Sequence, residues 1–420
     1  MSENAGNHEG QIDGRRVREL TARHVMNTYR RLPLVLVRGE GSWVWDDEGR
    51  RYLDFVSGLA VTGVGHAHPA VVEAIARQAK VLGHVSNLYH SAPAAELAER
   101  LARASGLDQV FFCNSGAEAN ETALKLARRW AWRQAGSAGG KGPVPHVVLA
   151  AQHSFHGRTY GAMSLTGQAK YQEGYAPLVP GIVHVPLNDP AALEAAFTRE
   201  VCAVLLEPVQ GEGGVYPCTE EYLKAARRLC DEGGALLMLD EVQTGLGRTG
   251  KMFAFQHYGI RPDVLTLAKT LGGGLPLGAT LARKEVAEAF VPGSHASTFG
   301  GNPICCAAGL AVMDLLEREA LPERAARLGR RLVEGLLDLG RRNLKVGEVR
   351  GLGLMVGVDI GDEAAAVAAA CRERGLLVNA VAEHTLRFLP PLVATEEEVD
   401  LALAILERAL TGLEDTPGRH

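Results

Sequence analysis

Two hydrophobic patterns divide the chain. In residues 32–55, LPLVLVRGEGSWVWDDEGRRYLDF, apolar and polar positions alternate around glycine-rich turns. A period of two predicts hairpin strands with one buried face. From about residue 70, short continuous apolar runs alternate with helical periods, and these runs are QVFFC (109–113), HVVLA (146–150), VCAVLLE (201–207), ALLMLD (235–240) and DVLTLAK (263–269). Such runs, separated by helices, predict a mostly parallel sheet covered by helices on both faces.

Three of these apolar runs end in a polar side chain suited to chemistry, namely Glu207, Asp240 and Lys269. In open α/β sheets, ligands bind beside the carboxyl ends of the strands. We therefore expect the three side chains to share one site.

The pattern changes again after about residue 315, where helical segments rich in Leu, Arg and Glu surround VGEVRGLGLMVGVDI and LRFLPPLV. This predicts a second, smaller α+β domain. We expect a large domain over residues 70–314, a small domain built from residues 15–69 and 315–420, and a disordered N-terminus over residues 1–14. The stretch GSAGGKGPVP, residues 136–145, is typical of a surface loop.

Composition and charge exclude several classes of function. The 420 residues carry a formal net charge of −5, so no basic field attracts nucleic acid or an anionic membrane. The seven cysteines lack CxxC spacing, which argues against a disulfide framework and a zinc site. No secretory apolar segment and no run near the roughly 18 apolar residues of a membrane span is visible. We expect a cytoplasmic protein that binds no metal.

Lys269 and Asp240 together indicate a cofactor. A lysine ending an apolar run is costly to desolvate, and a Schiff base with an aldehyde cofactor would explain its position. The alternative is a lysine that extends to the surface. Asp240, 29 residues earlier, could hold a pyridine nitrogen protonated, although it could also cap a helix. The pair at the ends of successive strands favours the cofactor.

The segment FFCNSGAEANETALKLARR predicts a strand, a turn and a long helix. Ser115 and Glu118 have capping-box spacing. The helix N-terminus also offers free N–H groups to an anion such as a phosphate, and Gly116 would let the anion approach the backbone. Capping and phosphate binding are compatible.

GLGRTG, residues 245–250, matches a dinucleotide-binding fingerprint, with Asp263 lying 18 residues from Gly245. However, Asp263 begins an apolar run rather than ending one, and KMFAFQHYG is a poor crossover helix. The nucleotide-binding oxidoreductase is therefore a remote alternative.

Six motifs carry a resemblance to a known family. NSGAEANE, SFHGRT, EPVQGEGG, LDEVQTGLGRTG, LAKTLGGGLPLG and STFGGNP occur in this order. The chain resembles the class III aminotransferases of the ornithine and acetylornithine type from about residue 30 to 410. The resemblance implies the fold-type-I architecture, pyridoxal 5′-phosphate (PLP) as cofactor, and a homodimer with its active site at the subunit interface.

The resemblance also implies roles for individual residues. Lys269 would be the Schiff-base lysine that also moves a proton, and Asp240 the partner of the ring nitrogen. The other implied cofactor contacts are Gln243 at the ring hydroxyl, Phe155 stacked on the ring, Glu207 near the ring, Ser115, Gly116 and Ala117 at the phosphate, and Thr298 at the phosphate of the partner subunit's cofactor.

For substrates, the resemblance implies that Arg158 binds a carboxylate and that Arg387 binds the other carboxylate of glutamate. Glu212 would neutralise Arg387 when the substrate lacks that second carboxylate, and Ser297 would reach the neighbouring subunit's substrate. Leu59 stands where ornithine enzymes have tyrosine, and an apolar wall suits a neutral acylated nitrogen. We expect transfer of the δ-amino group of N2-acetyl-L-ornithine to 2-oxoglutarate in arginine biosynthesis. Ornithine, succinylornithine and 4-aminobutyrate are the alternative donors.

Overall fold

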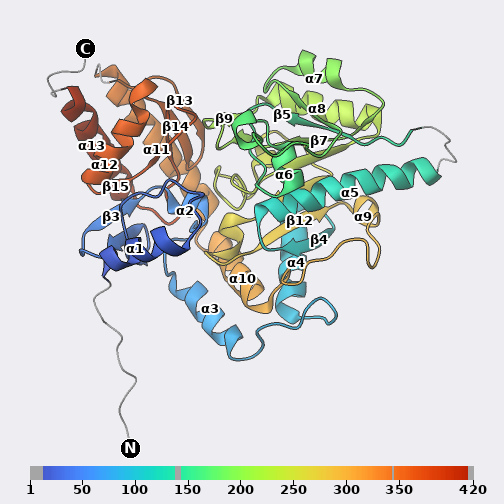
Figure 1. Ribbon diagram of the computed structural model, residues 1–420, viewed down its shortest axis with the longest axis horizontal. Coiled ribbons are helices and arrows are strands. Elements are labelled where there is room, and N and C mark those ends of the chain that lie inside the picture. Colours follow the sequence, from blue (N-terminus) through green and yellow to red (C-terminus); the bar gives the residue numbers. More distant parts are fainter. Residues whose placement is uncertain (1–12, 138–142, 343–344, 415–420) are drawn as a thin grey trace, which may run out of the picture.

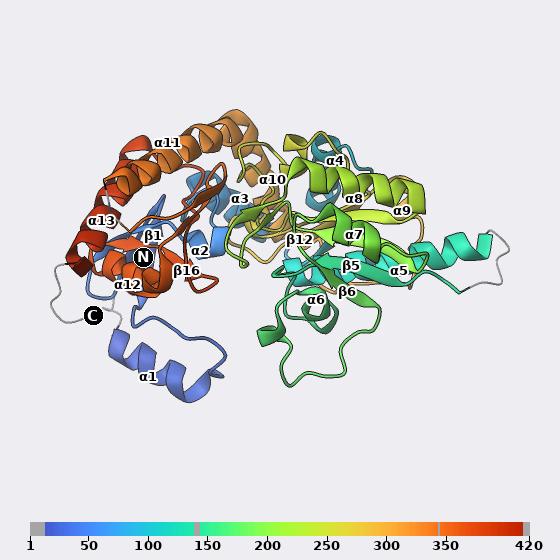
Figure 2. The same cartoon turned by 90° about the horizontal axis from the view of Figure 1, so that it is seen from above.

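The computed structural model describes residues 13–137, 143–342 and 345–414. Figure 1 shows two lobes, one holding the elements from β4 to β12 and the other holding the N-terminal strands together with the C-terminal helices. Figure 2 shows the same two lobes from above, with the long helix α5 (Gly116–Ser137) extending outward from the larger one.

The large lobe is built on a seven-stranded sheet of order β4-β12-β11-β10-β7-β5-β6. Its strands are β4 (Gln109–Cys113), β5 (Val147–Ala151), β6 (Ile182–Val185), β7 (Val201–Leu206), β10 (Leu236–Asp240), β11 (Val264–Leu267) and β12 (Gly278–Ala282). Only β12 runs antiparallel to its neighbours β11 and β4. The expected fold class is confirmed, and each of the five apolar runs contains or overlaps a strand. The runs missed β6 and β12.

Alternate residues of the central strands face two separate hydrophobic cores. Val204 and Leu206 of β7 pack in the core that also holds helix α8 (Glu220–Gly233), whereas Ala203 and Leu205 pack in the core that holds α5. Helices therefore bury the sheet on both faces, which explains its continuously apolar strands. The remaining helices of this lobe are α3 (Pro69–Ala79), α4 (Ala92–Ser105), α6 (Tyr160–Leu165), α7 (Pro190–Ala196), α9 (Lys284–Ala287) and α10 (Pro303–Arg318), with 3₁₀ turns η1 (Ala169–Tyr171), η2 (Ala254–His257) and η3 (Lys269–Gly272).

Two four-stranded sheets form the small lobe, with orders β1-β2-β3-β15 and β13-β14-β17-β16. Their strands are β1 (Leu36–Glu40), β2 (Trp43–Asp46), β3 (Arg51–Asp54), β13 (Val349–Leu352), β14 (Met355–Asp359), β15 (Leu376–Leu377), β16 (Asn379–Val381) and β17 (Thr385–Phe388). The helices are α1 (Gly14–His24), the one-turn α2 (Ser57–Ala60), α11 (Leu321–Arg341), η4 (Gly361–Glu363), α12 (Ala364–Glu373) and α13 (Glu396–Glu414). A two-stranded ribbon of β8 (Val209–Gln210) and β9 (Tyr216–Pro217) reaches towards this lobe from the larger one.

The two ends of the chain meet in the small lobe. β3 pairs in parallel with β15, so that Leu53 lies opposite Leu376. The indole of Trp43 donates to Glu398 at 2.8 Å, across 355 positions of sequence. Ser57 Oγ donates to the carbonyl of Leu389 at 2.7 Å. The N-terminal strands β1, β2 and β3 thus form one sheet with the C-terminal strand β15.

The expected disorder over residues 1–14 falls mostly on residues 1–12, which lie outside the described part of the chain, as do 138–142 of the expected loop. Residues 13 and 14 correct that expectation, because Asp13 accepts from the backbone of Arg16 and Gly14 begins α1. The expected boundary at residues 314/315 falls within α10.

Candidate active site

A cavity of about 460 Å³ opens at the carboxyl ends of the large-lobe strands. Ten residues singled out in the sequence line it, namely Ser115, Gly116, Ala117, Phe155, Arg158, Glu207, Glu212, Asp240, Gln243 and Lys269. The structure therefore brings together side chains from residue 115 to residue 269. Arg387 lies behind Glu212, and Ser297 and Thr298 are not part of the lining.

Lys269 lies two residues beyond β11, where the chain turns with a positive φ of 47°. Burial lowers the pKa of its amine, and the cation of Arg387 lowers it further, whereas the carboxylates of Glu212, Asp240 and Glu207 act in the opposite direction. Within the described residues, the amine makes no hydrogen bond or ion pair. A buried amine with a lowered pKa and no fixed partner is suited to nucleophilic attack.

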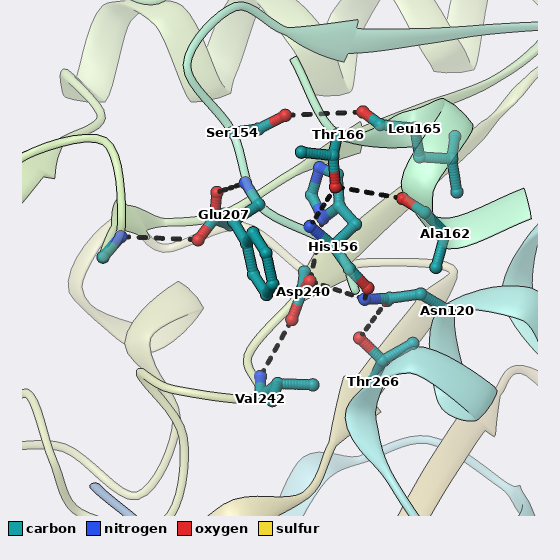
Figure 3. Close-up of polar contacts among 12 residues, drawn as sticks. Asn120, Ser154, His156, Ala162, Leu165, Thr166, Glu207, Asp240, Val242 and Thr266 are labelled. Carbon is teal, nitrogen blue, oxygen red and sulfur yellow. Dashed lines mark hydrogen bonds and ion pairs between the residues drawn. The ribbon is translucent and has the colours of Figure 1, made fainter. Parts of the chain in front are cut away.

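Asp240 ends β10, the strand beside β11, and is 4% exposed. Figure 3 shows three groups holding its carboxylate: His156 Nδ1 at 2.8 Å, Asn120 Nδ2 at 2.7 Å and the backbone N–H of Val242 at 3.0 Å. Thr266 in turn donates to Asn120 Oδ1 at 2.9 Å. The carboxylate is thereby fixed in one orientation at the cavity wall.

His156, Asn120 and Thr266 were missed in the sequence. A signal existed for two of them, because Asn120 is a polar residue on the buried face of α5 and His156 stands in the middle of SFHGRT. His156 Nε2 is a buried atom without a partner among the described residues. Asn120 and His156 line the cavity beside Asp240 and hold its carboxylate, and Thr266 lies outside the lining and holds Asn120.

Glu207 directly follows the last residue of β7, and its buried side chain forms part of the cavity wall. It accepts from the backbone N–H of Phe155 at 2.9 Å and from that of Gly211 at 3.4 Å. Burial raises the pKa of Glu207 to about 7 against the opposing effect of His156. Glu207 thus holds the backbone of the aromatic residue Phe155 and the first glycine of the loop that carries Glu212.

The N-terminus of α5 forms one end of the cavity. Ser115 caps the helix, because its Oγ accepts from the N–H of Glu118 at 3.2 Å. The return contact differs from that of a capping box, since the Glu118 carboxylate accepts from Ser115 Oγ at 3.0 Å and from the backbone N–H of Asn114 at 2.9 Å. The first hydrogen bond of the helix runs from Ala119 to Ser115, so the N–H groups of Gly116 and Ala117 precede it and are available to an anion. Glycine at position 116 also has a packing reason, since a Cβ there would lie 2.6 Å from Val242.

Two arginines offer carboxylate sites of different kinds. Arg158 is exposed, and its guanidinium lies 3.9 Å from the centroid of the Tyr171 ring. Arg387 on β17 is fully buried, and its Nη1 donates to Glu212 at 2.6 Å and to Gln243 Oε1 at 3.4 Å. Its Nη2 is buried without a partner in the described structure.

The carboxylate of Glu212 therefore binds Nη1 of Arg387 and leaves the other terminal nitrogen, Nη2, free to bind a second group. Burial would raise the pKa of Glu212, but Arg387 and Lys269 together bring it below its usual range. At neutral pH the pair is ionised, and Glu212 neutralises a cation that would otherwise be buried alone.

Ser297 and Thr298 lie in the loop before α10. Ser297 Oγ is 3.3 Å from Asn114 Nδ2, and Asn114 lines the cavity, whereas Thr298 is exposed. Leu59 lies in α2, whose Leu59 and Ala60 have φ angles of 64° and 67°. It is 43% exposed and outside the cavity, and Val61 supplies the apolar wall instead.

GLGRTG does not open a crossover helix. A short 3₁₀ turn, η2, follows it, and the buried carboxylate of Asp263 forms ion pairs with the partly exposed Arg227 at 2.9 Å and Arg283 at 2.8 Å. Arg248 within the motif is buried, and it donates to the carbonyls of Leu354 and Pro390. This segment joins the two lobes and lacks the geometry of a dinucleotide site.

The residues present fit PLP. The cavity holds a reactive amine at Lys269, a fixed carboxylate at Asp240 for a ring nitrogen, and free N–H groups at a helix N-terminus for a phosphate. Across residues 13–414, with the gaps given above, no cluster of His, Cys, Asp and Glu could hold a metal ion. In the same part of the chain, no helix is long and apolar enough to cross a membrane.

Comparison with known proteins agrees with this fit. Residues 25–410 match the family model "Aminotransferase class-III". The acetylornithine aminotransferase of Caldanaerobacter subterraneus is 51% identical over 93% of this chain and 98% of its own length, and that of Gloeobacter violaceus is 52% identical over 93% and 96%.

Solved structures agree as well. An ornithine aminotransferase from Toxoplasma gondii with PLP at its active site superposes with a TM-score of 0.92 at 34% identity, covering 97% of this chain and 96% of that one. An acetylornithine aminotransferase from Elizabethkingia anophelis gives 0.85 at 35%, covering 96% and 100%. The chain therefore belongs to the class III aminotransferases and is a PLP-dependent transaminase.

Proposed function

We propose that this enzyme transfers the δ-amino group of N2-acetyl-L-ornithine to 2-oxoglutarate, as a step of arginine biosynthesis in the cytoplasm. The observation that carries the proposal is the Arg387–Glu212 pair beside Lys269. The donor offers one carboxylate and the acceptor offers two. A site that binds both substrates needs one cation that always binds a carboxylate. It also needs a second cation whose charge is neutralised when the substrate has no second carboxylate.

Arg158 supplies the permanent binder in this proposal. It is exposed at the cavity, and stacking on Tyr171 orients its planar fork for a carboxylate. Arg387 supplies the second binder. A dicarboxylate displaces Glu212 from Nη1 and takes the free Nη2, whereas a monocarboxylate leaves the pair closed.

PLP, when bound, supplies an aldehyde that accepts amino groups and a ring that withdraws electrons from the reacting carbon. Lys269 accepts on its Nζ the proton that leaves the reacting carbon, and it later donates that proton back. The carboxylate of Asp240 would lie beside the ring nitrogen and favour its protonated form. Because the amino group is carried between two separate half-reactions, ping-pong kinetics are expected.

We also propose a homodimer in which Ser297 and Thr298 complete the partner's site. Supporting this, Asn87 donates to the carbonyls of Ser297 and Gly300, which brings that loop beside residues 81–89. The adjoining surface exposes large apolar side chains, with Val81 at 75%, Leu88 at 85%, Tyr89 at 71% and Phe299 at 59%. Large apolar side chains exposed on two neighbouring segments are typical of an interface.

The test of the donor is a comparison of amino-donor half-reactions under single-turnover conditions. We expect kcat/KM for N2-acetyl-L-ornithine to exceed that for ornithine and 4-aminobutyrate by about tenfold or more, as one well-placed polar contact provides. A higher value for 4-aminobutyrate or ornithine would reject acetylornithine as the substrate. A higher value for succinylornithine would keep the acylated class but change the acyl group.

Replacing each arginine by alanine separates their roles. Arg387→Ala is expected to lower kcat/KM for 2-oxoglutarate and glutamate by about 10²-fold, the value of a charge-assisted hydrogen-bond pair, and to affect the acetylornithine half-reaction much less. Arg158→Ala should weaken both half-reactions. Stopped-flow measurement of each half-reaction checks this division, and equal losses in both from Arg387→Ala would contradict it.

A further inference from the structure

The glycine loop that carries Glu212 crosses the small-lobe sheet between two arginines. Arg350 on β13 lies opposite Gly357 on β14, and Gly357 lies opposite Arg387 on β17. Side chains of directly opposed residues in antiparallel strands point to the same face. Arg350 and Arg387 therefore project from one face of the sheet, with a residue that has no side chain between them.

Gly357 forms a notch into which the loop packs. A Cβ at Gly357 would lie 2.8 Å from the Cβ of Val215, so only glycine admits this approach. Val215 itself has a positive φ of 60°, and Gly214 before it has a φ of 115°. A β-branched residue rarely adopts positive φ, which indicates that surrounding contacts hold the loop in place.

Arg350 makes the polar contacts that hold it. Its Nε donates to the carbonyl of Gly214 at 2.9 Å, and its Nη2 donates to Thr385 Oγ1 at 2.7 Å. The guanidinium also lies 4.0 Å from the centroid of the Tyr216 ring. Arg350 is 8% exposed, and its third polar contact, to Glu348 at 3.2 Å, is with a solvent-exposed carboxylate.

These contacts tie both members of the Glu212–Arg387 pair to one rigid group. Gly214 is two residues after Glu212, and Thr385 is two residues before Arg387 on the same strand and face. The planar guanidinium fixes the distance between the backbone carbonyl of Gly214 and the side-chain hydroxyl of Thr385. A shift in the loop would move Glu212 away from a cation that is immobile in the sheet.

We propose that Arg350 is a positioning residue for substrate discrimination, which holds the Gly214 end of the loop so that Glu212 closes on Arg387. The inference rests on the proposed function of that pair as a gate between monocarboxylate and dicarboxylate substrates. Arg350 acts through Glu212 and does not line the cavity. Without it, the closed arrangement loses stability relative to the one in which a dicarboxylate occupies Arg387.

The experiment uses Arg350→Met in the PLP-loaded enzyme, because methionine retains the apolar stem and removes the donors. We expect kcat/KM for the monocarboxylate amino donor to fall about tenfold, as for loss of one hydrogen bond from a charged group, with 2-oxoglutarate changed by less than about twofold. Calorimetry with glutarate and butyrate supplies a readout that requires no turnover. The affinity ratio of glutarate to butyrate should rise about tenfold.

Three variants control for folding. Glu348→Gln removes only the solvent-side partner and should leave both half-reactions unchanged. Thr385→Val removes the Nη2 acceptor at constant size and should shift the affinity ratio in the same direction as Arg350→Met, so it tests the idea if methionine unfolds the protein. Arg350→Lys should restore part of the discrimination.

Equal losses in both half-reactions, or an unchanged glutarate-to-butyrate ratio in folded Arg350→Met and Thr385→Val, would overturn the inference. Failure of the proposed donor is distinguishable, because it would appear as a different preferred donor in the unaltered enzyme. The ratio of the two simple acids tests Arg350 whichever donor is preferred.

Discussion

Replacement of Lys269 by alanine is expected to abolish transamination, with kcat in both half-reactions lowered by about 10⁴-fold or more, the upper range for a positioned acid–base group. In the proposed reaction, the change removes the amine that would bind the coenzyme covalently and move the proton. No other lysine is among the residues that line the cavity in the described structure, so no neighbouring amine could replace that of Lys269. The visible absorbance of lysine-bound coenzyme should disappear, and spectroscopy together with single-turnover assays checks both effects.

Lys251→Ala is the matched control, because Lys251 is exposed and lies beyond the GLGRTG turn. It should leave the spectrum and the rates unchanged. A Lys269→Ala protein that still turned over within about tenfold of the normal rate would refute the role given to this lysine.

Asp240→Asn should lower kcat in both half-reactions by about 10²- to 10³-fold, comparable to the loss of one electrostatic contact at a reacting centre. Asparagine matches aspartate in size but carries no charge to keep the ring nitrogen protonated. It also loses acceptor capacity towards His156, Asn120 and Val242. Rapid-reaction kinetics of each half-reaction, with coenzyme affinity measured in parallel, tests this.

Asp231→Asn serves as the control on the exposed side of α8. Because the ring nitrogen matters equally to donor and acceptor chemistry, the two losses should agree within about threefold. A selective loss in one half-reaction would assign Asp240 to substrate recognition instead. Thermal unfolding separates either result from simple destabilisation of the buried network.

The strands of the large sheet could be predicted where the apolar run was long and ended in a polar residue. The run QVFFC coincides with β4. As expected, Asp240 ends a strand that pairs with β11, the strand that precedes Lys269. β12 was missed because GATLA is short and rich in small residues, so it carries no clear period. Its antiparallel direction depends on pairing with β4 and β11, which local sequence does not encode.

The sequence predicted many of the residues of the site but not the hydrogen bonds between them. Ten expected residues line one cavity, yet the network of Asn120, His156 and Thr266 around Asp240 joins positions up to 146 residues apart. Hydrogen bonds between such distant positions leave no spacing signal. Likewise, the packing of Gly116 against Val242, 126 residues later, leaves no trace in the local sequence.

The pairing of β3 with β15 also imposes an order on folding during synthesis. Ser57 cannot form its hydrogen bond until Leu389, 332 residues later, has been synthesised. Synthesis of that length takes roughly 20 to 70 seconds at about 5–20 residues per second. The strands of the large lobe, from Gln109 to Ala282, are all translated within that interval. The N-terminal hairpins therefore emerge from the ribosome well before β15 is synthesised, and until then β3 has an unpaired edge at which other chains could pair.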